Sequence, residues 1–105
     1  MRNGSIKDSL HSVIVALCAD YGRRKEAIEK RLAPHRVDTE MRYYNFKMFD
    51  AAAEIVGDEK AEQFIREIGE SIGYAYSSIE GISETTYKKY KKLVVENITR
   101  ALHLA

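Results

Sequence analysis

Apolar residues recur at three- and four-residue steps through almost the whole chain, and this spacing limits the fold more than any other feature. Side chains three or four residues apart share one face of an α-helix, so each such stripe predicts an amphipathic helix. No segment shows the sustained alternation of β-branched residues that is typical of a strand. The sequence therefore predicts an all-α fold, and its 105 residues suffice for a single domain, 1–105, with a modest core.

Breakers and capping residues set the expected limits of the helices. We expect helices at about residues 5–21, 23–33, 38–56 and 59–72, with a closing helix at 84–103. Gly22 and Gly57 are suited to helix C-termini, and Pro34 disfavours the helical conformation of the residue before it. The second of these helices offers few apolar residues to a core, namely Ala27, Ile28 and Leu32. The expected N-caps are Asp38 or Thr39, Asp58 and Ser83.

Three of the six glycines lie within residues 65–82, where the pattern is otherwise helical. A glycine inside a helix costs about 1 kcal/mol relative to alanine, so each one needs a structural reason. Counted from Ile65, Gly69 and Gly73 occupy the fifth and ninth places of a helix-turn-helix unit at residues 65–84. The apolar places of that unit are also filled, by Ile68, Ile72, Tyr74, Ile79 and Ile82. We expect Gly73 to end the first helix in the left-handed conformation and Gly69 to allow a close helix crossing, whereas the motif does not require Gly81.

The second helix of this unit would span residues 76–82 and bring the expected bundle to five to six helices. It would present Tyr76, Ser77, Ser78 and Glu80 outward. Hydroxyl groups suit contacts to phosphates and to base edges. The segment departs from common recognition helices because it has no Arg, Lys, Asn or Gln.

The unit resembles the helix-turn-helix of bacterial transcription regulators. The wider segment 40–105, with the stretch RYYNFKMFDAAAEIVG and a closing helix rich in Tyr and Lys, is similar to small phage or prophage regulators of the RinA and ArpU type. This resemblance implies a cytoplasmic, sequence-specific transcription regulator whose partners are double-stranded DNA and the transcription machinery. It would place Tyr76, Ser77, Ser78 and Glu80 at the groove. A homodimer is expected, because one motif reads only one half-site.

Four lysines near the start of the closing helix would then contact DNA phosphates: Lys88, Lys89, Lys91 and Lys92. Cations at a helix N-terminus oppose the helix dipole, and a nearby anion would relieve this. The alternative interpretation of the run is an ordinary solvated helix face.

Charge is unevenly distributed along the chain. The net charge is +4 for residues 1–49, −6 for 50–80 and +3 for 81–105. DNA would therefore meet basic ends and an acidic middle. The alternatives are a non-enzymatic helical protein-interaction module, whose acidic middle binds a basic partner, and a structural or packaging component of a phage-like particle.

Residues that could carry other chemistry are scattered. His11, His35 and His103 lie far apart, and no glycine-rich phosphate loop follows a strand. The single cysteine, Cys18, falls on an apolar stripe and is expected to be a buried thiol in a reducing cytoplasm. The longest apolar run, VIVALCA, is much shorter than a membrane span. We therefore expect no enzyme activity, no cofactor, no metal and no membrane.

Overall fold

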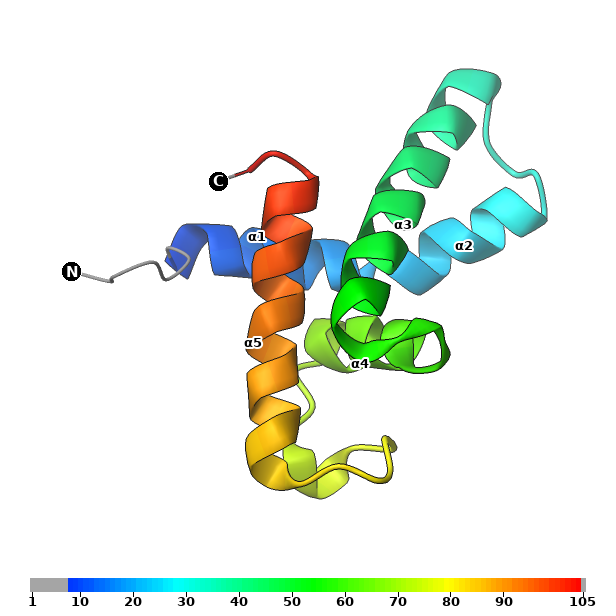
Figure 1. The fold of residues 1–105 in the computed structure, drawn as a ribbon. Helices are drawn as coiled ribbons and strands as arrows, with labels where there is room; N and C mark the ends of the chain where they lie inside the picture. The colour runs from blue at the N-terminus through cyan, green and yellow to red at the C-terminus, as the bar shows by residue number, and fades with distance from the viewer. Residues whose placement is uncertain (1–7, 105) are drawn as a thin grey trace.

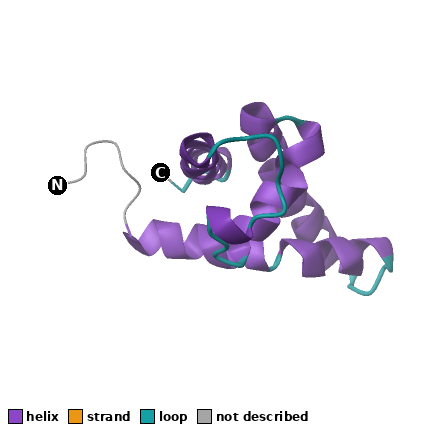
Figure 2. Cartoon of the chain, turned by 90° about the horizontal axis from the view of Figure 1, so that it is seen from below, coloured by secondary structure: helices purple, strands orange, loops and turns teal. Residues whose placement is uncertain are grey.

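The computed structural model describes residues 8–104. Its helices are α1 (Asp8–Ala19), α2 (Tyr21–Glu29), α3 (His35–Val56), α4 (Asp58–Gly69) and α5 (Glu84–Ala101), and η1 (Tyr74–Tyr76) is one turn of 3-10 helix. None of the residues 8–104 lies in a strand, which confirms the predicted all-α class (Figure 2). α3 packs on α4 and α5, and α1 packs on the same two helices (Figure 1).

α4 supplies the centre of the core. Its predicted apolar face is buried, with Phe64 and Ile65 fully inaccessible to solvent. It meets buried residues of the three helices around it, which are Ile14 and Cys18 of α1, Met48 and Ala52 of α3, and Val94 and Ile98 of α5. Full burial of a large apolar side chain stabilises a fold by about 1.5–3 kcal/mol. The stripes seen in the sequence are therefore the faces that hold the helices together.

The chain turns sharply between α1 and α2. α1 ends at Ala19, two residues before the expected Tyr21, and Gly22 lies in the first turn of α2 instead of capping α1. The part of the expected helix before Asp8 lies outside the described residues. The buried Arg24 side chain holds this corner: its Nη2 donates to the Leu17 carbonyl at 2.8 Å and its Nε to Asn45 Oδ1 of α3 at 2.7 Å. A cation at the last carbonyls of α1 also interacts favourably with the helix dipole.

α2 and the N-terminal half of α3 form a hairpin, residues 21–47, that projects to the upper right in Figure 1. We call it the α2–α3 arm. α3 begins at His35, earlier than the expected Asp38 or Thr39, because Pro34 has a backbone conformation suited to the position just before a helix. Leu32 is 69% exposed, so its expected place in the core is wrong. The turn that joins the two helices carries this side chain away from the body.

One residue separates α3 from α4. Gly57, with φ of 87°, ends α3 as expected and also stands at the N-cap of α4. Asp58 is therefore the first residue of α4 and not its cap. Asp58 and Glu59 still lie in the first turn, where the helix dipole favours anions. At the other expected cap, Ser83 Oγ accepts from the Thr86 N–H of α5, which confirms that prediction.

The helix-turn-helix expected at residues 65–84 lacks its second helix. Residues 77–83 are not helical, and η1 is the only regular turn between α4 and α5. α4 ends at Gly69, short of the expected residue 72, and Ser71 instead of Gly73 adopts the left-handed conformation, with φ of 55°. The Ser71 N–H donates to the Ile68 carbonyl and the Ile72 N–H to the Glu67 carbonyl, which closes the helix end. Gly73 is extended, with φ of −88°.

Gly69 does allow a close crossing, but its partner is α1. A Cβ atom at this position would lie 2.5 Å from the Ala19 nitrogen and 2.7 Å from the Cys18 carbonyl carbon, both backbone atoms. Only a residue without a side chain permits this approach. Gly81, which the motif did not require, has φ of 85° and so occupies a turn conformation that favours glycine.

Candidate nucleic-acid interface

A buried carboxylate organises the segment between α4 and α5. Glu67, near the end of α4, is fully buried. Its oxygens accept hydrogen bonds from three residues of the following segment and of α5. The donors are Ser77 Oγ at 2.7 Å, the Ser78 N–H at 2.8 Å, Ser78 Oγ at 2.9 Å and the Tyr87 hydroxyl at 2.8 Å. We call these four residues the Glu67 cluster.

The electrostatics of the Glu67 cluster favour the ionised carboxylate. Burial alone would raise the pKa of Glu67, but the hydrogen bonds from Ser77, Ser78 and Tyr87 outweigh it and hold the pKa below its ordinary value. Burial, followed by the hydrogen bond to Glu67, raises the pKa of the Tyr87 hydroxyl to about 12. Hydrogen-bond donors thus stabilise the negative charge of Glu67. These hydrogen bonds hold residues 77–78 against α4 and α5.

The Glu67 cluster explains why residues 76–82 are not a helix. The Ser78 N–H and both serine hydroxyls donate to the carboxylate, so Ser77 and Ser78 do not project from a recognition helix, although Ser78 remains exposed. Ser77 Oγ also accepts from the Ile79 N–H, which forms a local turn. A recognition helix here would leave the buried Glu67 carboxylate without most of its donors, and an unsatisfied buried group costs about 1–3 kcal/mol, more when it is charged.

Tyr76, Ser78 and Glu80 are the expected groove residues that lie at the surface, whereas Ser77 is half-buried. Tyr76, at the end of η1, is 86% exposed, the most exposed large apolar side chain of the described chain. The neighbouring Tyr74 packs its ring on that of Tyr87, with centroids 5.6 Å apart, and its hydroxyl donates to the Ile82 carbonyl. Tyr76 is therefore presented on a turn that is anchored on both sides.

The four lysines of α5 have different surroundings. Lys91 Nζ donates to the Ile72 carbonyl at 2.6 Å and lies 5.3 Å from the centre of the Tyr87 ring, so this lysine holds the loop. Lys88 pairs with Glu84 of the first turn at 2.9 Å, and this acid offsets the unfavourable placement of cations near the helix N-terminus. Lys89 and Lys92 are exposed. The accessible cations of this face are thus Lys88, Lys89 and Lys92.

The sequence pattern did not reveal Glu67 or Arg24 as structural centres. The sequence did contain one signal for Glu67. This acidic residue lies between Ile65 and Ile68, on the predicted apolar face of α4. An acid on a buried face requires donors, and serine or tyrosine residues further along the chain can supply them. For Arg24, inside a strongly charged helix, no comparable signal exists.

Other kinds of site were sought in the same residues. Within residues 8–104 no group of three or more His, Cys, Asp or Glu side chains is placed to hold a metal ion. In the described part of the chain, no helix has the length and apolar character needed to cross a membrane. Comparisons with protein families, with curated proteins and with solved structures find no match to this chain.

Proposed function

We propose that the protein is a cytoplasmic DNA-binding transcription regulator, of phage or prophage type, that contacts double-stranded DNA with the surface formed by η1 and the start of α5. The observation that carries this proposal is Tyr76, which is 86% exposed on a turn that is anchored on both sides. The segment that follows Tyr76 continues directly into α5, which carries the exposed lysines. Lysines supply sequence-independent attraction to phosphates, and an exposed ring can stack on a base or enter a groove.

On this surface, phosphate contacts and base contacts come from different elements, unlike those of a recognition helix. Lys88, Lys89 and Lys92 would contact phosphates, while Tyr76 and Glu80 would meet bases, since a carboxylate can accept from the amino group of cytosine. Ser77, Ser78 and Lys91 would act indirectly, because their polar groups hold the loop that carries Tyr76. Sequence preference would therefore depend on few contacts, and a homodimer would be needed to read a complete site.

The decisive measurement is the affinity for duplex DNA over a range of salt concentrations. Lys89→Gln with Lys92→Gln should weaken binding to all duplexes and reduce the slope of log K against log salt by about 2, because each lost phosphate contact removes about one unit. Lys60→Gln, a lysine of the acidic α4, is the matched control. Tyr76→Ala should change which duplexes are selected from a random pool. Absence of any duplex binding at low salt would refute the proposal.

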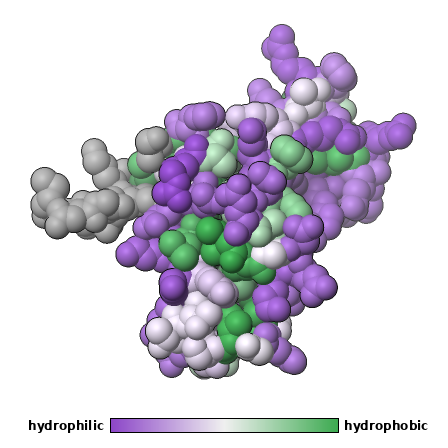
Figure 3. Space-filling model, in the orientation of Figure 1, coloured by the Kyte–Doolittle hydropathy of each residue, from purple (hydrophilic) through white to green (hydrophobic). Residues whose placement is uncertain are grey.

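A second candidate function, a helical protein-interaction module, is favoured by the α2–α3 arm. Two apolar side chains there are strongly exposed: Leu32 at 69% and Phe46 at 67%. Val37 and Tyr43 of the same arm are also exposed. Figure 3 shows a further gathering of apolar side chains beside α5 on the face in view. Exposed apolar patches of this kind mark interaction surfaces.

The arm offers a surface for self-association, and sedimentation velocity tests it. A homodimer through the arm should dissociate when Phe46→Ser is combined with Leu32→Ser, with no change in helix content. Tyr76→Ser, which removes an exposed ring outside the arm, should leave the dimer intact. A wild-type chain that sediments as a monomer would rule out this use of the arm.

A further inference from the structure

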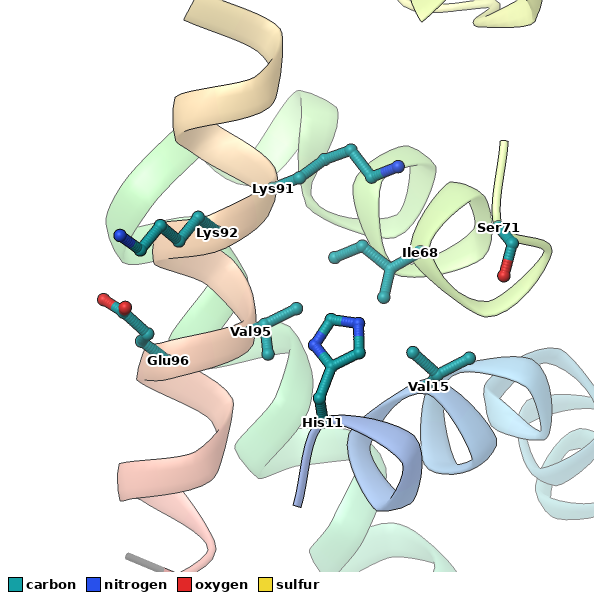
Figure 4. A pocket seen from close by; sticks show the side chains of 8 residues that line it. All are labelled: His11, Val15, Ile68, Ser71, Lys91, Lys92, Val95 and Glu96. Atoms are coloured by element: carbon teal, nitrogen blue, oxygen red, sulfur yellow. The ribbon is translucent and has the colours of Figure 1, made fainter. Parts of the chain in front are cut away.

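A pocket of about 440 Å³ lies between α1, the end of α4 and α5. Its lining is part apolar and part polar: Val15, Ile68 and Val95 on one hand, and His11, Ser71, Lys91, Lys92 and Glu96 on the other. Figure 4 shows the His11 ring directed into the space between the three apolar side chains, with Lys91 extending across the top. Lys92 and Glu96 point to the other side of α5. This volume is in the range of pockets that bind small molecules.

Lys91 provides a positioned cation at this pocket. Its ammonium group carries three N–H donors, and the Ile72 carbonyl takes one of them at 2.6 Å. The contact with Ile72 and the position over the Tyr87 ring restrict the side chain, so a ligand would meet a group that is already oriented. Burial lowers the pKa of Lys91 because the charged form loses hydration; the Glu67 carboxylate offsets part of this effect, and a ligand anion close to Lys91 would offset more of it.

The remaining lining complements an apolar body attached to the anion. Ile68 is 3% and Val95 5% exposed, and Val15 is half-buried, so the apolar wall is small, is held in place by the core and is formed mainly by Val15. The hydroxyl of Ser71 and the imidazole of His11 are polar groups on the same pocket. A ligand that is only apolar would not use the N–H donors of Lys91 that the Ile72 carbonyl leaves available, whereas a highly charged ligand would leave the apolar wall unused.

We propose that this pocket binds a small organic monocarboxylate with an aliphatic body. The carboxylate would accept from Lys91, with His11 and Ser71 as further polar contacts, and the aliphatic body would lie on Val15, Ile68 and Val95. Binding at this site does not depend on whether the α5 surface contacts DNA.

Methyl and amide NMR of the full chain, titrated with sodium octanoate, tests the proposal. The methyl signals of Val15, Ile68 and Val95 should shift together and saturate. 1-Octanol has the same chain length without the charge. Its affinity should be lower than that of octanoate by a factor of about ten or more, as expected for the loss of one charge-assisted hydrogen bond. Lys91→Met should weaken octanoate binding by a similar factor, and Lys60→Met should not change it.

Because Lys91 also holds the loop, a second variant keeps that contact. Val15→Phe fills the pocket from α1 and should abolish octanoate binding without altering the Lys91 interaction with Ile72. Three results would overturn the proposal: no shifts at the three lining residues, equal affinity for octanoate and octanol, or shifts confined to the exposed apolar residues of the α2–α3 arm.

Discussion

Replacement of Gly69 by alanine tests the closest helix contact in the protein. The added Cβ atom would lie 2.5 Å from the Ala19 nitrogen and 2.7 Å from the Ala19 Cα atom. Non-bonded carbon atoms normally approach to about 3.5–4.0 Å, so α1 and α4 would have to separate by about 1 Å. α1 cannot move without disturbing Ile14 and Cys18, which are buried against α4 and α5.

The magnitude follows from two opposed effects. Inserting a methyl group into a well-packed contact typically costs about 1–3 kcal/mol. Alanine has a higher helix propensity than glycine by about 1 kcal/mol, but Gly69 is the last residue of α4, where little of this gain is realised. Gly69→Ala should therefore lower the free energy of unfolding by about 1–3 kcal/mol, with a fall in Tm of about 4–8 °C per kcal/mol for a domain of this size.

Urea unfolding followed by circular dichroism measures this difference. Gly22→Ala is the matched control, because Gly22 lies in the first turn of α2 and a Cβ atom there meets nothing within 4 Å. The control should be neutral or stabilising by up to about 1 kcal/mol. If Gly69→Ala is as stable as the wild type, with the same dependence on urea, the close crossing of α1 and α4 is not present and the reasoning fails.

Three other changes have defined outcomes. Ser71→Gly should raise the free energy of unfolding in urea by about 0.5–1 kcal/mol, because Ser71 has φ of 55°, and a destabilised variant would contradict that conformation. Glu67→Gln should lower it by about 1–3 kcal/mol at neutral pH. Folding depresses the pKa of Glu67, so the difference in free energy of unfolding between the wild type and this variant should have its full size above the pKa of the unfolded chain, about 4.3. The difference should shrink as the pH falls through the pKa of Glu67 in the folded protein. A difference that does not depend on pH would exclude an ionised Glu67. Burial raises the pKa of the Cys18 thiol to about 12, so iodoacetamide should label it slowly in the native protein and rapidly in urea, and fast native labelling would contradict its burial.

Much of the helical framework could be predicted from local pattern. The apolar stripes around Ile14, Phe64 and Val94 identified buried faces, and Gly57 and Ser83 marked helix ends where the structure has them. These signals are local: a stripe depends on the 3.6-residue period, and a cap depends on hydrogen bonds within one turn. The end of α1, just before Asp20, has no such signal and was predicted two residues too late. The buried Arg24 of α2 determines this end by its hydrogen bond to the Leu17 carbonyl.

The candidate interface was predicted less well. Tyr76, Lys88, Lys89 and Lys92 are at the surface as expected, but the helix proposed to carry the first of them does not form. The helix-turn-helix pattern rested on glycine and isoleucine spacing, and several arrangements satisfy that spacing. Gly69 illustrates the point: the need for a small residue was correct, and the helix that requires it is α1.

By itself the sequence determined the all-α class, the buried faces of the helices and the need for glycine at residues 57 and 69, because these depend on helix geometry and on side-chain size. Only the tertiary structure decided the conformation of residues 70–83. Glu67 is buried by the packing of α4, and a buried carboxylate must find donors. Ser77, Ser78 and Tyr87, which follow it by 10 to 20 positions, supply them, and this requirement outweighs the local tendency of the segment to form a helix.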